Sequence, residues 1–157
     1  MRPAHSLHNK KILITCGPTW IPIDDVRVIS NRSTGELGHR MALALKMAGA
    51  QVTVLEGPVS NPLESKSIRI REFSFFDELQ ELLQKELKEK YHAVIHAAAV
   101  SDYQLKEPIR GKLTSQRKGI TLNLIPTEKL ISLIKKYNPR TFLVGFKLEP
   151  ELNTTTD

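Results

Sequence analysis

The run AVIHAAAV, residues 93–100, constrains the fold of this chain more than any other feature. It is short and almost continuously apolar, which is typical of a strand that a parallel sheet buries on both faces. Four further apolar segments, two of them rich in β-branched residues, are predicted as strands. They are KILITC (11–16), QVTVLEG (51–57), SIRIREF (67–73) and TFLVGF (141–146). GITLNLI (119–125) alternates weakly and is either a further strand or part of a loop.

Helical patterns separate these strands. The first is predicted to begin near Ser33 or Thr34 and to end at Gly49, and the second to begin at Ser74. The third is predicted to be capped by Thr127. Their apolar stripes are Leu37, Met41, Ala44, Leu45 and Ala48; Phe76, Leu79, Leu83 and Leu87; and Leu130, Ile131, Ile134 and Tyr137.

The alternation of strand and helix predicts an α/β fold with a mostly parallel sheet and helices on both faces. Residues 101–119 are polar and basic, and we expect them to form a loop. No helical pattern follows the strand that ends at Phe146, so we expect a single domain over 1–157 that is shortened at its C-terminus or relies on a partner there.

Charge and composition narrow the classes of function. The formal net charge of +6 suits nucleic acid but also small anions, and aromatic residues do not interleave with the basic ones as a single-strand binding surface requires. No apolar run approaches the ~18 residues that span a bilayer. The N-terminus lacks a signal-peptide core, and the only cysteine is Cys16, so we expect a cytoplasmic protein with no nucleic-acid or membrane partner.

The connection after the first strand is unusually long. Strand-to-helix connections usually have about 2–6 residues, whereas this one runs from Cys16 to Ser33 and carries several apolar side chains. It ends in SNRSTGELG, where hydroxyls and Gly35 precede a helix. Free N–H groups at a helix N-terminus favour an anion, so Ser33 and Gly35 are either a phosphate cradle or a plain helix cap followed by a packing glycine.

Other polar residues near the predicted strand ends have two interpretations each. Asn31 is either a ligand-binding amide or a turn residue with a left-handed backbone. Arg27 is either a bidentate anion ligand or a surface arginine, and Asp102 either faces a substrate or caps a turn. We interpret His96 as a packed, hydrogen-bonded histidine and expect His39 on the exposed side of its helix. No Cys/His set has metal-ligand spacing, and Cys16 reads as a small buried residue.

Several motifs together resemble the phosphopantothenoylcysteine synthetase family. ITCGPTWIPIDDVRVISNRSTGELG, EGPVS, HAAAVSDY, GKLT and LVGF follow its order and approximate spacing over residues 11–149. The resemblance implies a Rossmann-like fold, a homodimer, and a ligase of coenzyme A biosynthesis. Such enzymes join 4′-phosphopantothenate and cysteine through an acyl-nucleotide, using CTP or ATP and Mg²⁺. The family's flavin-binding domain has no counterpart here, so we expect no FMN.

The resemblance also implies roles for individual residues. Asn31 and Lys112 are expected to be catalytic, Lys112 as the first lysine of a flap that closes over the reacting centre. Arg27 is expected to reach the substrate of the neighbouring subunit. The phosphopantothenate site is expected to comprise Asn31, Ala98, Ala99 and Asp102, and the nucleotide site Gly17, Ser33, Gly35, Gly38 and Phe146.

Two other functions fit parts of the sequence. VIHAAAV resembles the fourth strand of short-chain NAD(P)-dependent reductases, but Tyr103 is not followed by the lysine of their Tyr-x-x-x-Lys motif. The second alternative is a non-catalytic remnant or split subunit that binds nucleotide or phosphopantothenate without turnover. It is kept because we expect the family to continue for tens of residues beyond the segment that is matched here.

Overall fold

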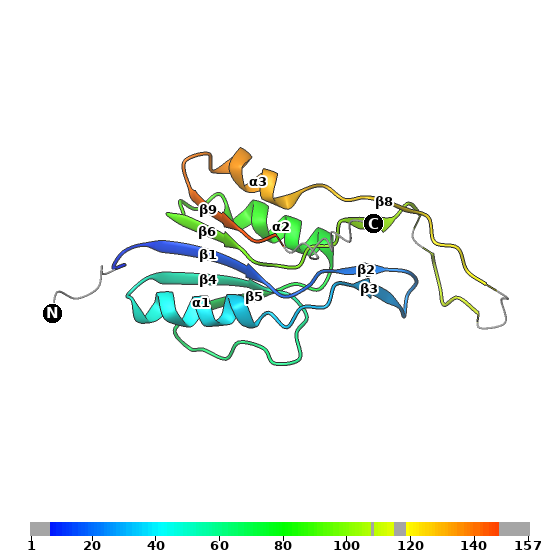
Figure 1. The fold of residues 1–157 in the computed structure, drawn as a ribbon, viewed down its shortest axis with the longest axis horizontal. Helices are drawn as coiled ribbons and strands as arrows, with labels where there is room; N and C mark the ends of the chain where they lie inside the picture. The colour runs from blue at the N-terminus through cyan, green and yellow to red at the C-terminus, as the bar shows by residue number, and fades with distance from the viewer. Residues whose placement is uncertain (1–6, 108, 115–118, 148–157) are drawn as a thin grey trace, which may run out of the picture.

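The computed structural model describes residues 7–107, 109–114 and 119–147. Its centre is a parallel sheet of five strands in the order β5-β4-β1-β6-β9, with a helical layer on each face (Figure 1). The strands are β1 (Lys11–Cys16), β4 (Gln51–Glu56), β5 (Arg69–Glu72), β6 (Ala93–His96) and β9 (Phe142–Gly145). The predicted Rossmann-like α/β fold, with three layers, is therefore confirmed.

Successive residues of a strand point to opposite sides of the sheet. Because helices cover both sides, the side chains on both faces of the central strands are buried. Leu13 of β1 belongs to a core shared with α2 (Phe76–Glu86) and α3 (Leu130–Tyr137). Ile12 and Ile14 belong to the opposite core, which is shared with α1 (Glu36–Met47). This two-sided burial explains the continuous apolar runs in the sequence. None of these three helices has the length or apolar content of a membrane span.

The face that α1 turns to the sheet differs from the predicted one. Leu37, Ala44 and Ala48 are exposed, and the fully buried residues of the helix are Gly38 and Ala42. A Cβ added to Gly38 would lie 2.3 Å from Cys16 Cβ, so α1 approaches β1 too closely for a larger side chain. The stripe prediction was therefore wrong for Leu37, Ala44 and Ala48, but Met41 and Leu45 pack against this core as expected. The helix is rotated towards Gly38 because the close contact with β1 needs a residue without a side chain.

Helix boundaries follow local backbone chemistry. Helix α1 begins at Glu36 rather than near Ser33, because Gly35 takes a left-handed conformation with φ 73°. The predicted stripe of α2 is buried as expected. Thr127 does not cap α3: Lys129 is the N-cap, and the Thr127 hydroxyl donates instead to Ser101 O at 2.6 Å.

Two short hairpins lie outside the central sheet. β2 (Trp20–Pro22) pairs antiparallel with β3 (Val28–Ser30) inside the long connection after β1. β7 (Tyr103–Leu105) pairs antiparallel with β8 (Leu124–Pro126), so the prediction of a loop was wrong for 103–105. Figure 1 shows both hairpins beyond the same edge of the sheet, the carboxyl edge of β1 and β6.

Candidate functional site

A cavity of about 610 Å³ lies beyond the carboxyl ends of β6 and β9. In an open parallel sheet this is where ligands bind, next to the point at which successive strands are added to opposite sides of β1. Its wall is formed by Asn31 and Arg32, by His96 and residues 98–102, by residues 127–131 at the start of α3, and by Phe146 and Lys147. The cavity therefore combines segments that are far apart in the sequence.

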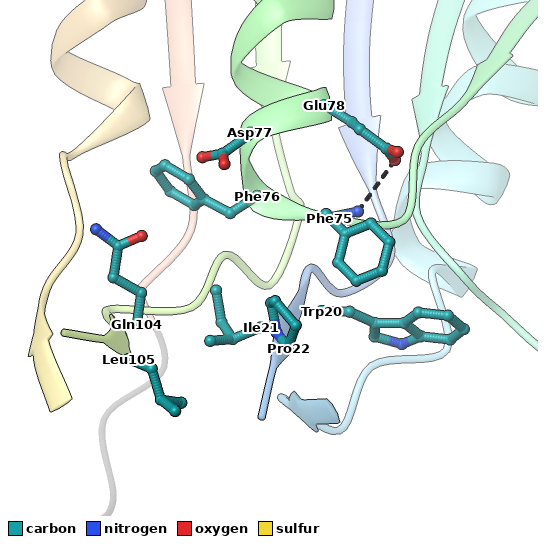
Figure 2. A pocket seen from close by; sticks show the side chains of 9 residues that line it. All are labelled: Trp20, Ile21, Pro22, Phe75, Phe76, Asp77, Glu78, Gln104 and Leu105. Carbon is teal, nitrogen blue, oxygen red and sulfur yellow. Dashed lines mark hydrogen bonds between the residues drawn. The ribbon is translucent and has the colours of Figure 1, made fainter. Parts of the chain in front are cut away.

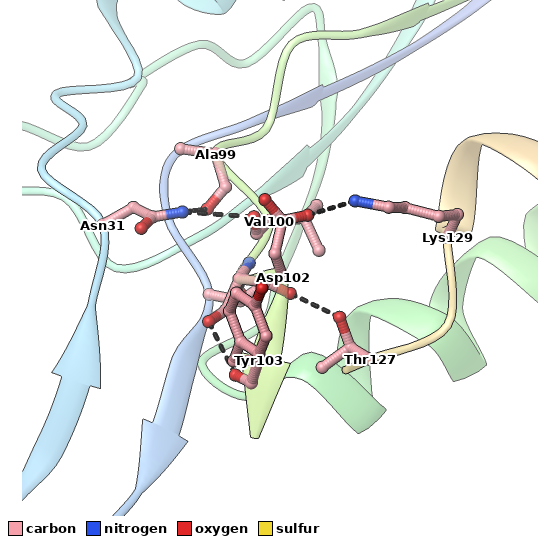
Figure 3. A network of polar contacts seen from close by, with 9 residues as sticks. Asn31, Ala99, Val100, Asp102, Tyr103, Thr127 and Lys129 are labelled. Carbon is pink, nitrogen blue, oxygen red and sulfur yellow. Dashed lines mark hydrogen bonds and ion pairs between the residues drawn. The ribbon is translucent and has the colours of Figure 1, made fainter. Parts of the chain in front are cut away.

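Asn31 is held by the segment that follows β6. Its side-chain nitrogen donates to Ala99 O at 3.2 Å and to Val100 O at 3.1 Å (Figure 3). Since an amide nitrogen has two hydrogens, both are used, and Oδ1 is left as the group that can accept from a ligand. Asn31 does not have the left-handed backbone considered as the alternative.

Asp102 is fixed through its backbone and its carboxylate. Its carbonyl oxygen accepts from Thr127 N at 2.9 Å. Its carboxylate pairs with Lys129 (Figure 3). The preceding Ser101 is buried, and its N–H donates to the Thr19 hydroxyl at 2.9 Å. The segments after β1 and β6 and the start of α3 are thus joined around the cavity. Thr127 and Lys129 were not predicted as site residues.

His96 lines the same cavity. It is hydrogen-bonded, as expected, with Nδ1 2.8 Å from Thr15 Oγ1. Burial lowers the pKa of His96 to about 4, because the ring loses the water that would stabilise a positive charge. The sequence interpretation gave the correct local environment but missed the exposure to the cavity.

The predicted nucleotide cradle lies to one side of this cavity. Ser33 and Gly35 are not among its lining residues, although Asn31 and Arg32 are. The Ser33 hydroxyl accepts from Gly35 N and the Thr34 hydroxyl from Glu36 N, both at 3.4 Å. These long contacts are weak, so an anion could replace them.

The glycines predicted to bind nucleotide differ in their surroundings. A Cβ on Gly35 would lie 3.0 Å from Val59 Cγ1 and 3.5 Å from Gly17 N, so these backbone segments approach each other closely. Gly17 and Gly35 both have positive φ angles, of 78° and 73°. Gly38, by contrast, is buried against Cys16, and its packing role explains its identity without a ligand.

Arg27 and Lys112 lie away from the cavity, beside the β2–β3 hairpin. The Arg27 guanidinium donates to Leu113 O at 3.0 Å and lies 3.3 Å from the Asp24 carboxylate. Asp24 accepts from the backbone N–H groups of Leu113, Val26 and Arg27. The hydrogen bond from Leu113 is the main reason that the pKa of Asp24 falls below its usual value. These contacts join the hairpin to the segment that carries Lys112. Of the predicted flap, residues 112–115, the last residue lies outside the described part of the chain, as do residues 116–118.

His39 is not on the exposed side of α1, so that prediction was wrong. Its Nε2 lies 2.5 Å from Glu56 Oε1, without hydrogen-bond geometry, and Cys16 Sγ is near both groups. These three side chains are potential metal donors that sequence spacing did not reveal. Glu56 Oε1 also accepts from Leu63 N at 3.0 Å. Burial, with a smaller effect of Glu56, raises the pKa of Cys16 to about 12, so its thiol stays protonated here.

An apolar pocket of about 330 Å³ lies between β2 and the start of α2 (Figure 2). The Trp20 and Phe75 rings meet edge to face there, with centroids 6.1 Å apart. A second pocket, of about 480 Å³, shares Trp20 and adds Val26 and Val28 from the hairpin. Val26 is 63% exposed. This aromatic and aliphatic surface was not predicted.

Comparisons with known proteins agree with this architecture. Residues 7–156 match the family described as DNA/pantothenate metabolism flavoprotein C-terminal domain. The coenzyme A biosynthesis bifunctional protein CoaBC of Thermococcus kodakarensis is 38% identical over 94% of the chain. The chain spans 36% of that protein, about a third of its length.

Two crystal structures are also similar. The DNA/pantothenate metabolism flavoprotein from Streptococcus pneumoniae is 32% identical with a TM-score of 0.78, over 88% of this chain and 69% of that one. The C-terminal domain of a CoaBC protein is 26% identical with a TM-score of 0.79, over 95% of this chain and 69% of that one.

Proposed function

The chain belongs to the DNA/pantothenate metabolism flavoprotein C-terminal domain family, and from this membership we propose that it ligates 4′-phosphopantothenate to cysteine in coenzyme A biosynthesis. One observation carries the proposal: the residues expected at the phosphopantothenate site and the aromatic residue expected beside the nucleoside line one cavity. They are Asn31, Ala98, Ala99, Asp102 and Phe146.

The proposed chemistry proceeds in two displacements. The pantothenate carboxylate attacks the α-phosphorus of CTP or ATP, and pyrophosphate leaves. The neutral amine of cysteine then attacks the acyl carbon, nucleoside monophosphate leaves, and the amine loses a proton. Because Asn31 Oδ1 is available as an acceptor, it suits the attacking amine, and this is the catalytic role that we propose for Asn31.

Electrostatics and positioning supply most of the proposed rate enhancement. A triphosphate and a phosphorylated acid bring much negative charge together, which preorganised cations and amides must offset. Arg32, Lys129 and Lys147 line the cavity. We propose that the backbone N–H groups at the N-terminus of α1 bind the phosphates. Lys112 is the cation that we propose for the flap. Mg²⁺ would bind mainly to nucleotide phosphates, and Asp102 and Glu128 are cavity carboxylates that could add oxygen ligands.

The proposed partner is a second copy of the chain. The exposed apolar surface around Trp20 and Val26 supports this, because such patches mark interaction sites. Arg27 lies at the same hairpin, as a residue reaching towards a partner subunit would. A cytoplasmic location remains a prediction.

Pyrophosphate release tests the function directly. The chain is mixed with Mg²⁺, 4′-phosphopantothenate, cysteine and either CTP or ATP, and the condensation product is identified by mass spectrometry. We expect pyrophosphate and product with at least one nucleotide, and no condensation product without cysteine. Nucleotide binding with no pyrophosphate would favour the non-catalytic alternative, and binding of NADPH instead would favour a reductase.

A further inference from the structure

The hydrogen bonds around His96 determine which of its ring nitrogens carries the proton. Thr15 Oγ1 lies 2.8 Å from His96 Nδ1 and also accepts from Ala98 N at 3.3 Å. Thr15 is fully buried, so its hydroxyl hydrogen needs an acceptor inside the protein. Within the described ranges, the hydrogen bonds of this hydroxyl offer one acceptor, His96 Nδ1. The Thr15 hydroxyl therefore donates to Nδ1.

This assignment leaves the proton of the neutral ring on Nε2. A neutral imidazole has one donor and one acceptor nitrogen, and Nδ1 is already used as the acceptor. Burial disfavours the charged form and lowers the pKa of His96 to about 4, so the ring is neutral at physiological pH. His96 thus has a single N–H donor that Thr15 does not use, and the residue lines the cavity.

The surroundings of this donor suggest what it binds. His96 pairs in register with Gly145 of β9, so Phe146, the next residue, follows at the same end of the cavity. Phe146 is 50% exposed and lines the cavity, as does the aliphatic side chain of Ile131. An exposed aromatic ring at the wall of a cavity suits a flat ligand ring. Asp102 and Lys129, which form an ion pair, line the same cavity and supply its charged groups.

We propose that His96, as the Nε2–H tautomer, donates a hydrogen bond to a ring carbonyl of the nucleobase whose ring packs against Phe146. An uncharged donor matches an uncharged carbonyl, whereas a phosphate would be better served by the cations of the cavity. Cytosine has such a carbonyl and adenine has none. The inference rests on the proposed nucleotide-dependent function and adds a selectivity for carbonyl-bearing bases.

The tautomer can be measured without any ligand. Long-range ¹H–¹⁵N correlation spectra of the labelled protein at pH 7 distinguish Nε2–H, Nδ1–H and imidazolium rings, and His96→Gln assigns the signal. We expect Nε2–H. A Nδ1–H ring or an imidazolium would overturn the proposal whatever the enzyme does.

Nucleotide binding then tests the contact. In calorimetric titrations, His96→Met should weaken the binding of CTP about five- to tenfold, which is the effect of losing one hydrogen bond. The affinity for ATP should change less than twofold. His96→Gln keeps an N–H donor and should recover most of the CTP affinity. Equal losses for both nucleotides, or unchanged CTP affinity in His96→Met with a native thermal melt, would overturn the proposal.

The two proposals can fail separately. His96-dependent CTP binding without pyrophosphate release would leave the contact intact and remove the ligase function. If the chain releases pyrophosphate from CTP and His96→Met changes neither KM nor kcat, the ligase function stands and the His96 contact is removed.

Discussion

Lys129 forms an ion pair with Asp102, although 27 residues separate them in the chain. Lys129 is the N-cap residue of α3 and Asp102 follows β6, so the pair joins two walls of one cavity. Both side chains remain about two-thirds exposed, at 66% and 64%. The pair is therefore better placed to meet a ligand than to stabilise the fold.

We expect Asp102→Asn to impair substrate use and to leave folding almost unchanged. Exposed ion pairs contribute about 0–1 kcal/mol, so urea unfolding should change by less than ~1 kcal/mol. Loss of a charged hydrogen-bond partner should raise KM for 4′-phosphopantothenate about tenfold or more. Lys129→Met is the matched variant, because it breaks the same pair and keeps the carboxylate. A normal KM in Asp102→Asn would remove this residue from the site.

Replacing Asn31 by Asp should lower both stability and turnover. The substitution keeps the shape of the side chain but places an oxygen against Ala99 O and Val100 O, where the amide now donates. We expect a loss of about 1 kcal/mol in urea unfolding and of most pyrophosphate release. Asn123→Asp, at an exposed position of the chain, is the control. An unchanged unfolding midpoint would contradict the hydrogen-bond assignment.

Gly38→Ala should destabilise the protein without any direct effect on a ligand. The new Cβ would lie 2.3 Å from Cys16 Cβ, so α1 and β1 must separate. Overpacking of this kind costs about 1–3 kcal/mol, which a urea midpoint detects. Gly119→Ala is the control, because nothing lies within 4 Å of its added Cβ. Weaker nucleotide binding by a normally stable Gly38→Ala would instead support the predicted contact with nucleotide.

Asp24 should contribute an acid-sensitive part of the stability. Hydrogen bonding, led by Leu113 N–H, lowers the pKa of Asp24 in the folded state below the ordinary value of about 3.9. The contribution of Asp24 to the free energy of unfolding is therefore complete above the pKa that Asp24 has in the unfolded chain. It is lost as the pH falls through the lower pKa of the folded state.

Asp24→Asn should accordingly lower stability at neutral pH and flatten its decline below about pH 4, as followed by chemical unfolding across pH. Asp25→Asn, at the exposed neighbouring carboxylate, is the matched variant. Identical slopes in the wild type and in Asp24→Asn would refute the assignment.

The surface around Trp20 and Val26 should mediate self-association. Val26→Asp places a charge in an exposed apolar patch and should shift the mass measured by light scattering from dimer to monomer. Met47→Asp, at a residue 89% exposed on α1, should leave the mass unchanged. A monomeric wild type at high protein concentration would end the dimer proposal.

The sequence by itself determined the strands that are buried on both faces and the helix whose buried residues recur at helical spacing. Both faces of β1 and β6 are buried, so a continuous apolar run was enough to predict them. The stripe of α2 was correct because that helix packs through large side chains such as Leu79 and Leu83. The order of these elements then predicted the parallel sheet and the edge at which the cavity lies.

Only the tertiary structure decided which residues meet around the cavity. The face of α1 depends on how closely Gly38 approaches β1, and the position of His39 depends on Glu56 of the neighbouring strand. The contacts from Asn31 to Ala99, and from Thr15 to His96, span 68 and 81 residues. Periodicity describes a residue's environment along its own helix or strand, whereas these contacts arise from the packing of one element against another.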